Sequence, residues 1–255
     1  MVEGYIDHNG FPVVMVTTTV LVNSSGESLD SLSRHLLRWA RVAVSDGEKE
    51  VVLTGMADKK YVPPYIYTTS RLKGASGKTY TLTVDYGDCH ATAVTTIPQC
   101  PKVDSVRVSP AVQDSLCSVV LSFSQEGNKR AYYKAFVRRG RYGKQWLPSP
   151  LATVNGELID GASHLVINRP DLITDTNHYS PYFSYSDTIS IKFAQIDERA
   201  YRFWSDFDNH VNFSHNMLFP SFNNLRGNID GGMGCWYGCG AVYGSFILAK
   251  YRSHQ

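Results

Sequence analysis

The stretch GKTYTLTVDYGDCHATAVTTIP, Gly77–Pro98, contains two runs of β-forming residues on either side of a short turn signal. In the first run Tyr80, Leu82 and Val84 alternate with polar residues, as in a strand with one buried face. Gly87 and Asp88 indicate the turn, after which a run rich in Thr, Ala and Val returns to Pro98. This stretch therefore predicts a β-hairpin.

The rest of the chain carries further strand signals at short intervals. Phe11–Val22 reads as a strand, and two β-rich runs flank Asp46-Gly47, which is a second hairpin signal. The second half adds the runs VDSVRV, LCSVVLSFS, AYYKAFVRR, HLVINR and DTISIKF. Short strands separated by turn signals predict a mainly β fold, with an N-terminal Ig-like β-sandwich.

One segment predicts an amphipathic helix near residues 195–211, in AQIDERAYRFWSDFDNHV. Its apolar residues fall on one helical face, namely Ile196, Ala200, Phe203, Trp204, Phe207 and Val211. Asp197 and Glu198 stand in the first turn, where the helix dipole favours negative charge. A second, weaker pattern of Leu29, Leu32 and Leu36 indicates a short helix.

The length of 255 residues suits one large domain or two ordinary ones. The segment PQCPKVD, Pro98–Asp104, contains two prolines that interrupt strand pairing. We therefore expect a first domain over residues 1–98, a linker over residues 99–104 and a C-terminal β-rich domain over residues 105–255.

Composition excludes several classes of protein. Hydrophobic residues make up 43% and charged residues 19%, which is typical of a globular chain rather than a disordered one. The formal net charge of +2 does not indicate a nucleic-acid partner. The longest apolar run, FPVVMVTTTVLV, is too short for a membrane span, and the opening MVEGYIDHNG has no signal-peptide pattern.

Several segments together resemble a family of bacterial proteins known as domain of unknown function 4249. The most specific are the hairpin ending in Thr-Thr-Ile-Pro, the Ile196–Tyr201 helix start and the glycine segment Asn228–Gly234; VEGYID, VAVSDG and LSFSQEGNKRAYYKAFVRR also match. The resemblance implies an exported lipoprotein of Gram-negative bacteria, tethered at the outer membrane or cell surface, whose genes lie beside those of TonB-dependent outer-membrane transporters. It implies no established activity and no catalytic residues. The acylated cysteine of such a lipoprotein does not stand in this chain, so the lipid anchor is an inference from the resemblance.

The glycine-rich segment GNIDGGMGCWYGCGAVYGS, Gly227–Ser245, fits neither a phosphate-binding loop nor a dinucleotide fingerprint. We predict a tight turn over Gly227–Gly234 and a mainly extended chain over Cys235–Lys250. Extended geometry places the Cα atoms of Cys235 and Cys239 about 13 Å apart, too far for a disulfide. The alternative is a turn at Trp236–Gly238 that brings the two sulfurs together.

Cys235, Cys239, His210 and His215 have spacings that a structural zinc site allows, C-x3-C and H-x4-H. The competing interpretation is that both histidines are ordinary surface residues and both thiols are free. A metal-dependent hydrolase built on Asp206, His210 and His215 is a further alternative, although no H-E-x-x-H or G-x-S-x-G motif accompanies these residues. We expect no cofactor.

Aromatic residues provide the candidate binding surface. The segment NHYSPYFSYSD places Tyr179, Tyr182, Phe183 and Tyr185 close together around a proline. Tyrosines on loops make amphipathic contact surfaces for partners or sugars, whereas alternating tyrosines can equally line a strand.

The family resemblance thus implies a non-enzymatic, exported surface lipoprotein. Its expected role is that of an accessory or ligand-capturing partner of an outer-membrane transporter, with a small-molecule, peptide or glycan ligand. A cell-adhesion or glycan-binding module is the alternative from a different functional class.

Overall fold

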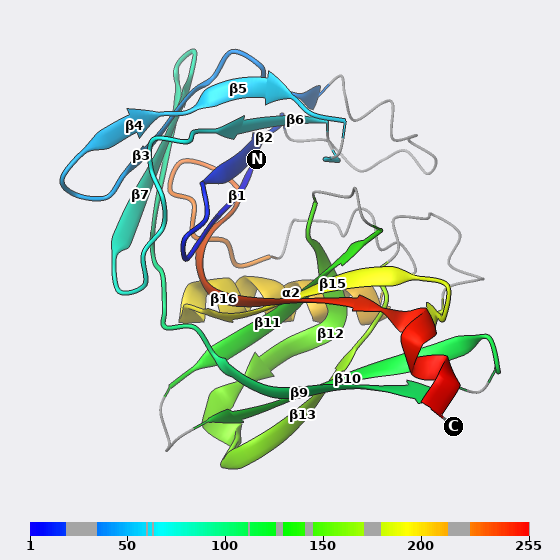
Figure 1. Ribbon diagram of the computed structural model, residues 1–255. Coiled ribbons are helices and arrows are strands. Elements are labelled where there is room, and N and C mark those ends of the chain that lie inside the picture. Colours follow the sequence, from blue (N-terminus) through cyan, green and yellow to red (C-terminus); the bar gives the residue numbers. More distant parts are fainter. Residues whose placement is uncertain are drawn as a thin grey trace. The chain divides into compact units, whose positions relative to one another are not determined.

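The chain divides into two compact units, each made of segments that are distant in sequence. The first unit comprises Met1–Gln99 and Ser221–Gly240, and the second comprises Cys100–Pro220 and Ala241–Gln255. The computed structural model in Figure 1 describes residues 1–18, 35–59, 61–62, 64–111, 113–125, 130–140, 145–170, 180–213 and 225–254, with the backbone alone at 210–213, 253 and 254.

The mainly β class is confirmed, and the described residues contain a single α-helix. The boundary between units at Gln99/Cys100 lies near the expected linker, but two details differ. A strand begins at Lys102, inside the predicted linker over residues 99–104. The segment Ser221–Gly240 returns to the first unit, whereas we expected residues 105–255 to form one domain.

The first unit contains the four-stranded sheet β4-β3-β7-β8 and five strands of an eight-stranded sheet, in the order β16-β1-β2-β6-β5. These strands enclose an apolar core. The strands are β1 (Val2–Asp7), β2 (Val13–Val16), β3 (Arg41–Ser45), β4 (Glu50–Val52), β5 (Thr54–Ala57), β6 (Tyr65–Thr68), β7 (Thr79–Tyr86), β8 (Cys89–Thr96) and the start of β16 (Gly234–Ile247). Side chains from both sheets, including Ile6, Val44, Leu82 and Trp236, form the core. The finer expectation of an Ig-like sandwich stays a prediction.

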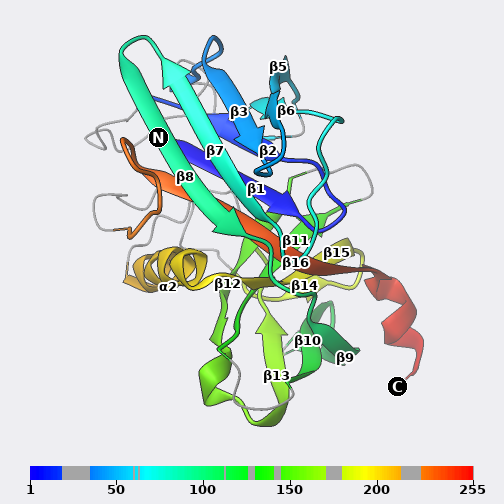
Figure 2. The ribbon, with the colours of Figure 1, turned by 90° about the vertical axis from the view of Figure 1, so that its left-hand side faces the viewer.

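The predicted hairpin is confirmed as β7 and β8, which pair antiparallel from Thr79↔Thr96 to Tyr86↔Cys89 (Figure 2). Tyr80, Leu82 and Val84 are buried, as their alternation predicts. Gly87 adopts a φ of 56° in the connecting turn, a conformation that glycine accepts without steric cost.

The second unit contains the strands β12-β11-β15-β16 of the eight-stranded sheet and a separate four-stranded sheet, around a core. In the four-stranded sheet β10 lies between β13 and β14 and also pairs with β9. Its elements are β9 (Lys102–Pro110), β10 (Leu116–Gln125), β11 (Tyr132–Arg139), β12 (Leu147–Asn155), η2 (Gly156–Leu158), β13 (Gly161–Ile167), β14 (Phe183–Ser184), β15 (Thr188–Ile196), α2 (Glu198–Phe213), the end of β16 and η5 (Leu248–His254). The buried face of β10 packs against β11 and β15, with Phe123 close to Tyr133 and Phe193.

Helix α2 is the amphipathic helix that the sequence predicts. Asp197 precedes it as an N-cap, since its carboxylate accepts a hydrogen bond of 2.8 Å from the Ala200 amide. Ala200, Phe203 and Trp204 are buried, and α2 packs on β11 and β12 (Figure 1). At Lys134 and Phe136, strand β11 is therefore covered on both faces, by the core on one side and by the helix on the other. No helix in the described part of the chain has the length and apolarity of a membrane span.

The glycine-rich segment is extended from Gly234 to Ile247, as predicted, and a 3-10 helix replaces the extended chain beyond it. Asn228 closes the preceding turn, because its side chain donates to the Trp236 carbonyl at 2.7 Å and accepts from the Trp236 amide at 2.8 Å. Beside Gly238, an added Cβ would lie 2.9 Å from Ile97 Cγ1. The glycine is therefore required for close packing.

The helix indicated by Leu29, Leu32 and Leu36 falls largely outside the described residues. Leu36 itself forms an isolated bridge with Thr17.

Candidate functional site

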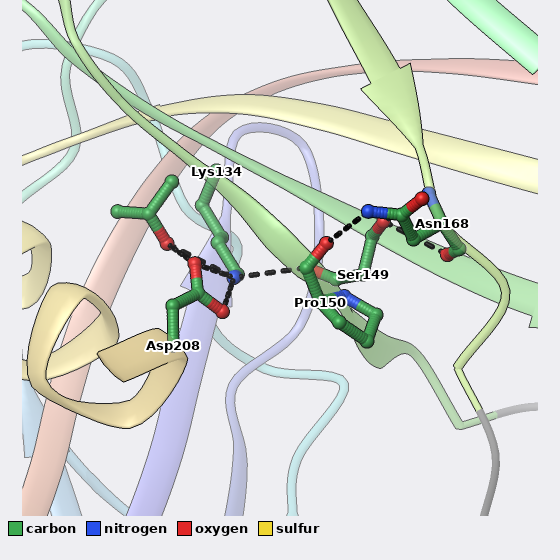
Figure 3. A network of polar contacts seen from close by, with 6 residues as sticks. Lys134, Ser149, Pro150, Asn168 and Asp208 are labelled. Carbon is green, nitrogen blue, oxygen red and sulfur yellow. Dashed lines mark hydrogen bonds and ion pairs between the residues drawn. The ribbon is translucent and has the colours of Figure 1, made fainter. Parts of the chain in front are cut away.

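A buried ion pair joins α2 to the sheet of the second unit. The Lys134 side chain on β11 has no exposed surface, and its Nζ lies 3.0 Å from both carboxylate oxygens of Asp208 on α2. Nζ also donates to the Ser149 carbonyl at 3.1 Å and to Thr153 Oγ1 at 2.9 Å. Figure 3 shows Lys134 between Asp208 on one side and Ser149 on the other.

Two acceptors of Lys134, the Ser149 carbonyl and the Thr153 hydroxyl, lie on an irregular part of β12. Lys134 pairs with Thr153 and Phe136 with Pro148, so the residues between the two positions on β12 bulge away from the ladder. Leu151 in this bulge has a φ of 58°, a conformation that costs a non-glycine residue of the order of 1–3 kcal/mol. Hydrogen bonds from the surrounding residues must therefore stabilise the bulge.

Asn168 provides those bonds from the end of β13. Its amide nitrogen and its carbonyl both bond to Ser149 Oγ at 2.9 Å, and its Nδ2 donates to the Pro150 carbonyl at 2.9 Å (Figure 3). The bulge, the end of β13 and helix α2 therefore form one polar network around Lys134.

The chemistry of this network favours a structural role. Burial lowers the pKa of Lys134, and the attraction of Asp208 opposes that change. An ammonium group has three N–H donors, and the acceptors from Ser149, Thr153 and Asp208 engage all of them. A nucleophilic lysine needs a free, neutral amine, which this arrangement does not favour.

A second cation, the guanidinium of Arg138, lies further along β11 on the same face as Lys134. Arg138 follows Lys134 and Phe136 at two-residue intervals on β11, so the three side chains share one face. The Arg138 guanidinium carbon lies 4.5 Å from the centroid of the Trp146 ring. Its Nη2 lies 3.5 Å from Ser190 Oγ, and its buried Nε has no hydrogen-bond partner among the described residues.

Two more residues complete this cluster. Tyr243 on β16 contacts Trp146, with ring centroids 5.5 Å apart and an interplanar angle of 44°. Ser245, two residues further along β16, shares a hydrogen bond of 2.9 Å with Ser190. We call Arg138, Trp146, Ser190, Tyr243 and Ser245 the Arg138 surface. Tyr243, with 52% of its surface exposed, and Ser245 are the exposed members, Arg138 and Trp146 are partly buried, and Ser190 is buried.

The predicted aromatic surface is not what the structure presents. Phe183 and Tyr185 are buried in the core of the second unit, so they cannot form a binding surface. Tyr182 is half-buried, and Tyr179 lies outside the described residues. The strand interpretation of the sequence applies to Phe183, which pairs with Cys117 through β14.

Of the predicted zinc set, only the side chains of Cys235 and Cys239 lie among the described residues. Cys235 and Cys239 are buried on one continuous strand, and neither forms a disulfide bond. The side chain of His210 and all of His215 lie outside the described residues, and Asp206 lies on α2. Among the residues whose side chains are described, no three His, Cys, Asp or Glu residues cluster in a way that could hold a metal ion.

The sequence analysis missed the Arg138 surface because its members come from three strands and from the residue that precedes β12. Alternation in AYYKAFVRR places Lys134, Phe136 and Arg138 on one face, and alternation along β16 places Tyr243 with Cys239 and Ala241. Neither pattern indicates that Trp146 lies over Arg138.

Comparison with known proteins gives one result. A family model described as Domain of unknown function (DUF4249) matches residues 1–242, which span the whole first unit and most of the second. None of the curated proteins compared with the chain matches it.

Proposed function

Since the chain belongs to the DUF4249 family, we propose that it is a non-enzymatic, exported surface lipoprotein that captures a ligand for a TonB-dependent outer-membrane transporter. The family resemblance supports the location and the partner, through the gene neighbourhood that it implies. A likeness between family members is an analogy, and a binding function depends on the residues of a specific site.

The Arg138 surface is the observation that supports binding. It combines an arginine without an acidic partner in the described part of the chain, two aromatic rings in contact, and an exposed serine hydroxyl. Aromatic and arginine side chains carry much of the energy of binding surfaces. Most of this surface lies on a sheet rather than on loops, which favours a preorganised geometry.

The buried network around Lys134 supports a role other than catalysis. Every donor of the ammonium group is engaged by the protein itself, in a position that links α2 to the sheet. A buried ammonium group whose donors are all engaged stabilises the fold, and it has no donor left for a substrate.

The test uses the native host. A tagged copy of the gene product is followed through outer-membrane fractionation and surface proteolysis, and its partners are isolated after crosslinking. We expect an outer-membrane location and co-isolation of a TonB-dependent transporter. A soluble cytosolic location, or crosslinking without any transporter, would contradict the proposal.

A glycan-binding or adhesion module is the second candidate, favoured by the partly exposed ring pair of Trp146 and Tyr243. Both functions use the Arg138 surface, and they differ in the partner. Deletion of the gene lowers uptake of the ligand if the transporter role holds. It lowers attachment of cells to a glycan-coated surface, with uptake unchanged, if the adhesion role holds.

A further inference from the structure

We infer that the Arg138 surface is a subsite for an acidic saccharide, in which Arg138 binds the carboxylate of a uronic acid and Trp146 and Tyr243 contact the sugar ring. This inference rests on the proposed binding function and specifies the class of ligand.

Arg138 has no carboxylate to pair with among the described residues, unlike the other cations of its strand. Strand β11 carries the cations Lys134, Arg138 and Arg139, of which Lys134 pairs with Asp208 and Arg139 lies 3.6 Å from Asp187. Arg138 has no carboxylate partner in the described part of the chain. Its Nη2 lies 3.5 Å from Ser190 Oγ, and its Nε is buried without a hydrogen bond to any described residue.

The shape of the guanidinium indicates which anion fits. A guanidinium offers two parallel N–H donors that match the two oxygens of a carboxylate. The Trp146 ring, 4.5 Å from the guanidinium carbon, restricts the rotation of the Arg138 side chain. The buried Nε is out of reach of a ligand, so a carboxylate would bind the two terminal nitrogens of Arg138, of which Nη2 has the long 3.5 Å contact with Ser190 Oγ.

The neighbouring side chains indicate the rest of the ligand. Trp146 and Tyr243 offer apolar ring faces beside polar tips, and Ser245 offers an exposed hydroxyl. A sugar acid presents the matching groups, namely the C–H face of its ring, hydroxyl groups and one carboxylate. A neutral sugar would leave Arg138 without an anion.

The position on the sheet argues against an extended acidic peptide. Peptides that bind to sheets add as a strand at an edge, through backbone hydrogen bonds. Arg138, Ser190 and Ser245 lie on three neighbouring strands, β11, β15 and β16, and form a row across the face of the sheet. A ligand held by side chains on a face, rather than by a strand edge, fits this arrangement.

The test measures binding by the purified full chain with uronic-acid trisaccharides. The probes are trimers of galacturonate, glucuronate, mannuronate and guluronate, each compared with its methyl ester, which has the same ring but no charge. Calorimetry and the fluorescence of tryptophan report binding. We expect at least one acid trimer to bind roughly tenfold more tightly than its ester, the scale of one charge-assisted pair.

Variants locate the site. Arg138→Gln should weaken binding of the acid by roughly tenfold or more while leaving the ester unchanged, and Arg138→Lys should lie between Gln and the wild type. Tyr243→Ala should weaken binding of both the acid and the ester. Arg139→Gln is the matched control, since it lies on the same strand and faces the other way, and it should bind as the wild type does. Circular dichroism checks that each variant is folded.

The inference is overturned if no acid trimer binds, if acid and ester bind equally, or if Arg138→Gln and Arg139→Gln behave alike. Selective binding of an acidic peptide instead of the trimers would overturn it as well. The assay contains no transporter, so its failure leaves the transporter proposal standing. Conversely, a missing transporter in the crosslinking experiment leaves the ligand class standing.

Discussion

Asp208 on α2 accepts hydrogen bonds from Lys134 on β11 through both of its carboxylate oxygens, each at 3.0 Å. Both residues are buried, and 74 positions of the sequence separate them. Removal of one member leaves the other as an unpaired charge without access to water, which is much more costly than removal of both.

Asp208→Ala should therefore lower the free energy of unfolding by about 3–5 kcal/mol. The double variant Lys134→Met with Asp208→Leu should recover most of that loss, because no charge is left unpaired. Urea denaturation followed by tryptophan fluorescence measures both. Glu198→Ala, which breaks an exposed pair with Arg202 on the same helix, is the control and should cost only about 0.3–0.5 kcal/mol. An Asp208→Ala variant as stable as this control would show that the buried pair does not hold α2.

Asn228→Ala should destabilise the first unit by about 1–3 kcal/mol, because the amide and carbonyl of Trp236 lose their partners. Asn228→Asp keeps the acceptor and loses the donor, so its loss should be smaller. Thermal unfolding of the three proteins under the same conditions provides the comparison. Equal stability of wild type and Asn228→Ala would mean that water replaces the side chain at no cost.

Gly238→Ala should cost about 1–3 kcal/mol through overpacking, since the new Cβ would lie 2.9 Å from Ile97 Cγ1 and 3.0 Å from the Ile97 backbone. Gly232→Ala is the matched control, because its nearest neighbour is the Ile229 methyl group at 3.2 Å and it has no positive φ. Its effect should be clearly smaller. Chemical denaturation measures both, and equal losses would argue that the Ile97 contact is not limiting.

The five cysteines should separate into two classes with a thiol reagent. Cys89 and Cys100 are exposed and should react in the native protein, whereas Cys117, Cys235 and Cys239 are buried and should react only after unfolding. Mass spectrometry of labelled peptides identifies the reacted sites. Native labelling of Cys235 or Cys239 would contradict their burial on β16.

The raised pKa of the Cys117 thiol predicts that the stability of the protein depends on pH. Burial, with a smaller contribution from Asp187, raises the pKa of its thiol to about 11 from the ordinary value of 9.0. The unfolded thiol loses its proton first as the pH rises, so the contribution of Cys117 to stability should fall between these two values. Because other groups titrate there too, the measurement is the difference between wild type and Cys117→Ala. A difference that stays constant across that range would contradict the raised pKa.

Local patterns of sequence determined the mainly β class, the β7–β8 hairpin, the extended course of β16 and the amphipathic helix α2. These features depend on neighbours a few positions apart, through alternation along a strand, a Gly-containing turn and the helical repeat. The absence of a Cys235–Cys239 disulfide followed from the same local geometry, because four residues of extended chain hold the two Cα atoms too far apart.

The tertiary structure alone decided which strands are neighbours and which aromatic residues face solvent. Val2 pairs with Gly234, and residues 227–240 of the glycine-rich segment belong to the first unit although they stand near the end of the chain. Phe183 and Tyr185 are buried, while Tyr243 is exposed and lies against Trp146. Alternation along a strand identifies its two faces, but the elements that pack on each face come from distant parts of the chain. Side chains of the same type are therefore buried in the core in one place and exposed to solvent in another.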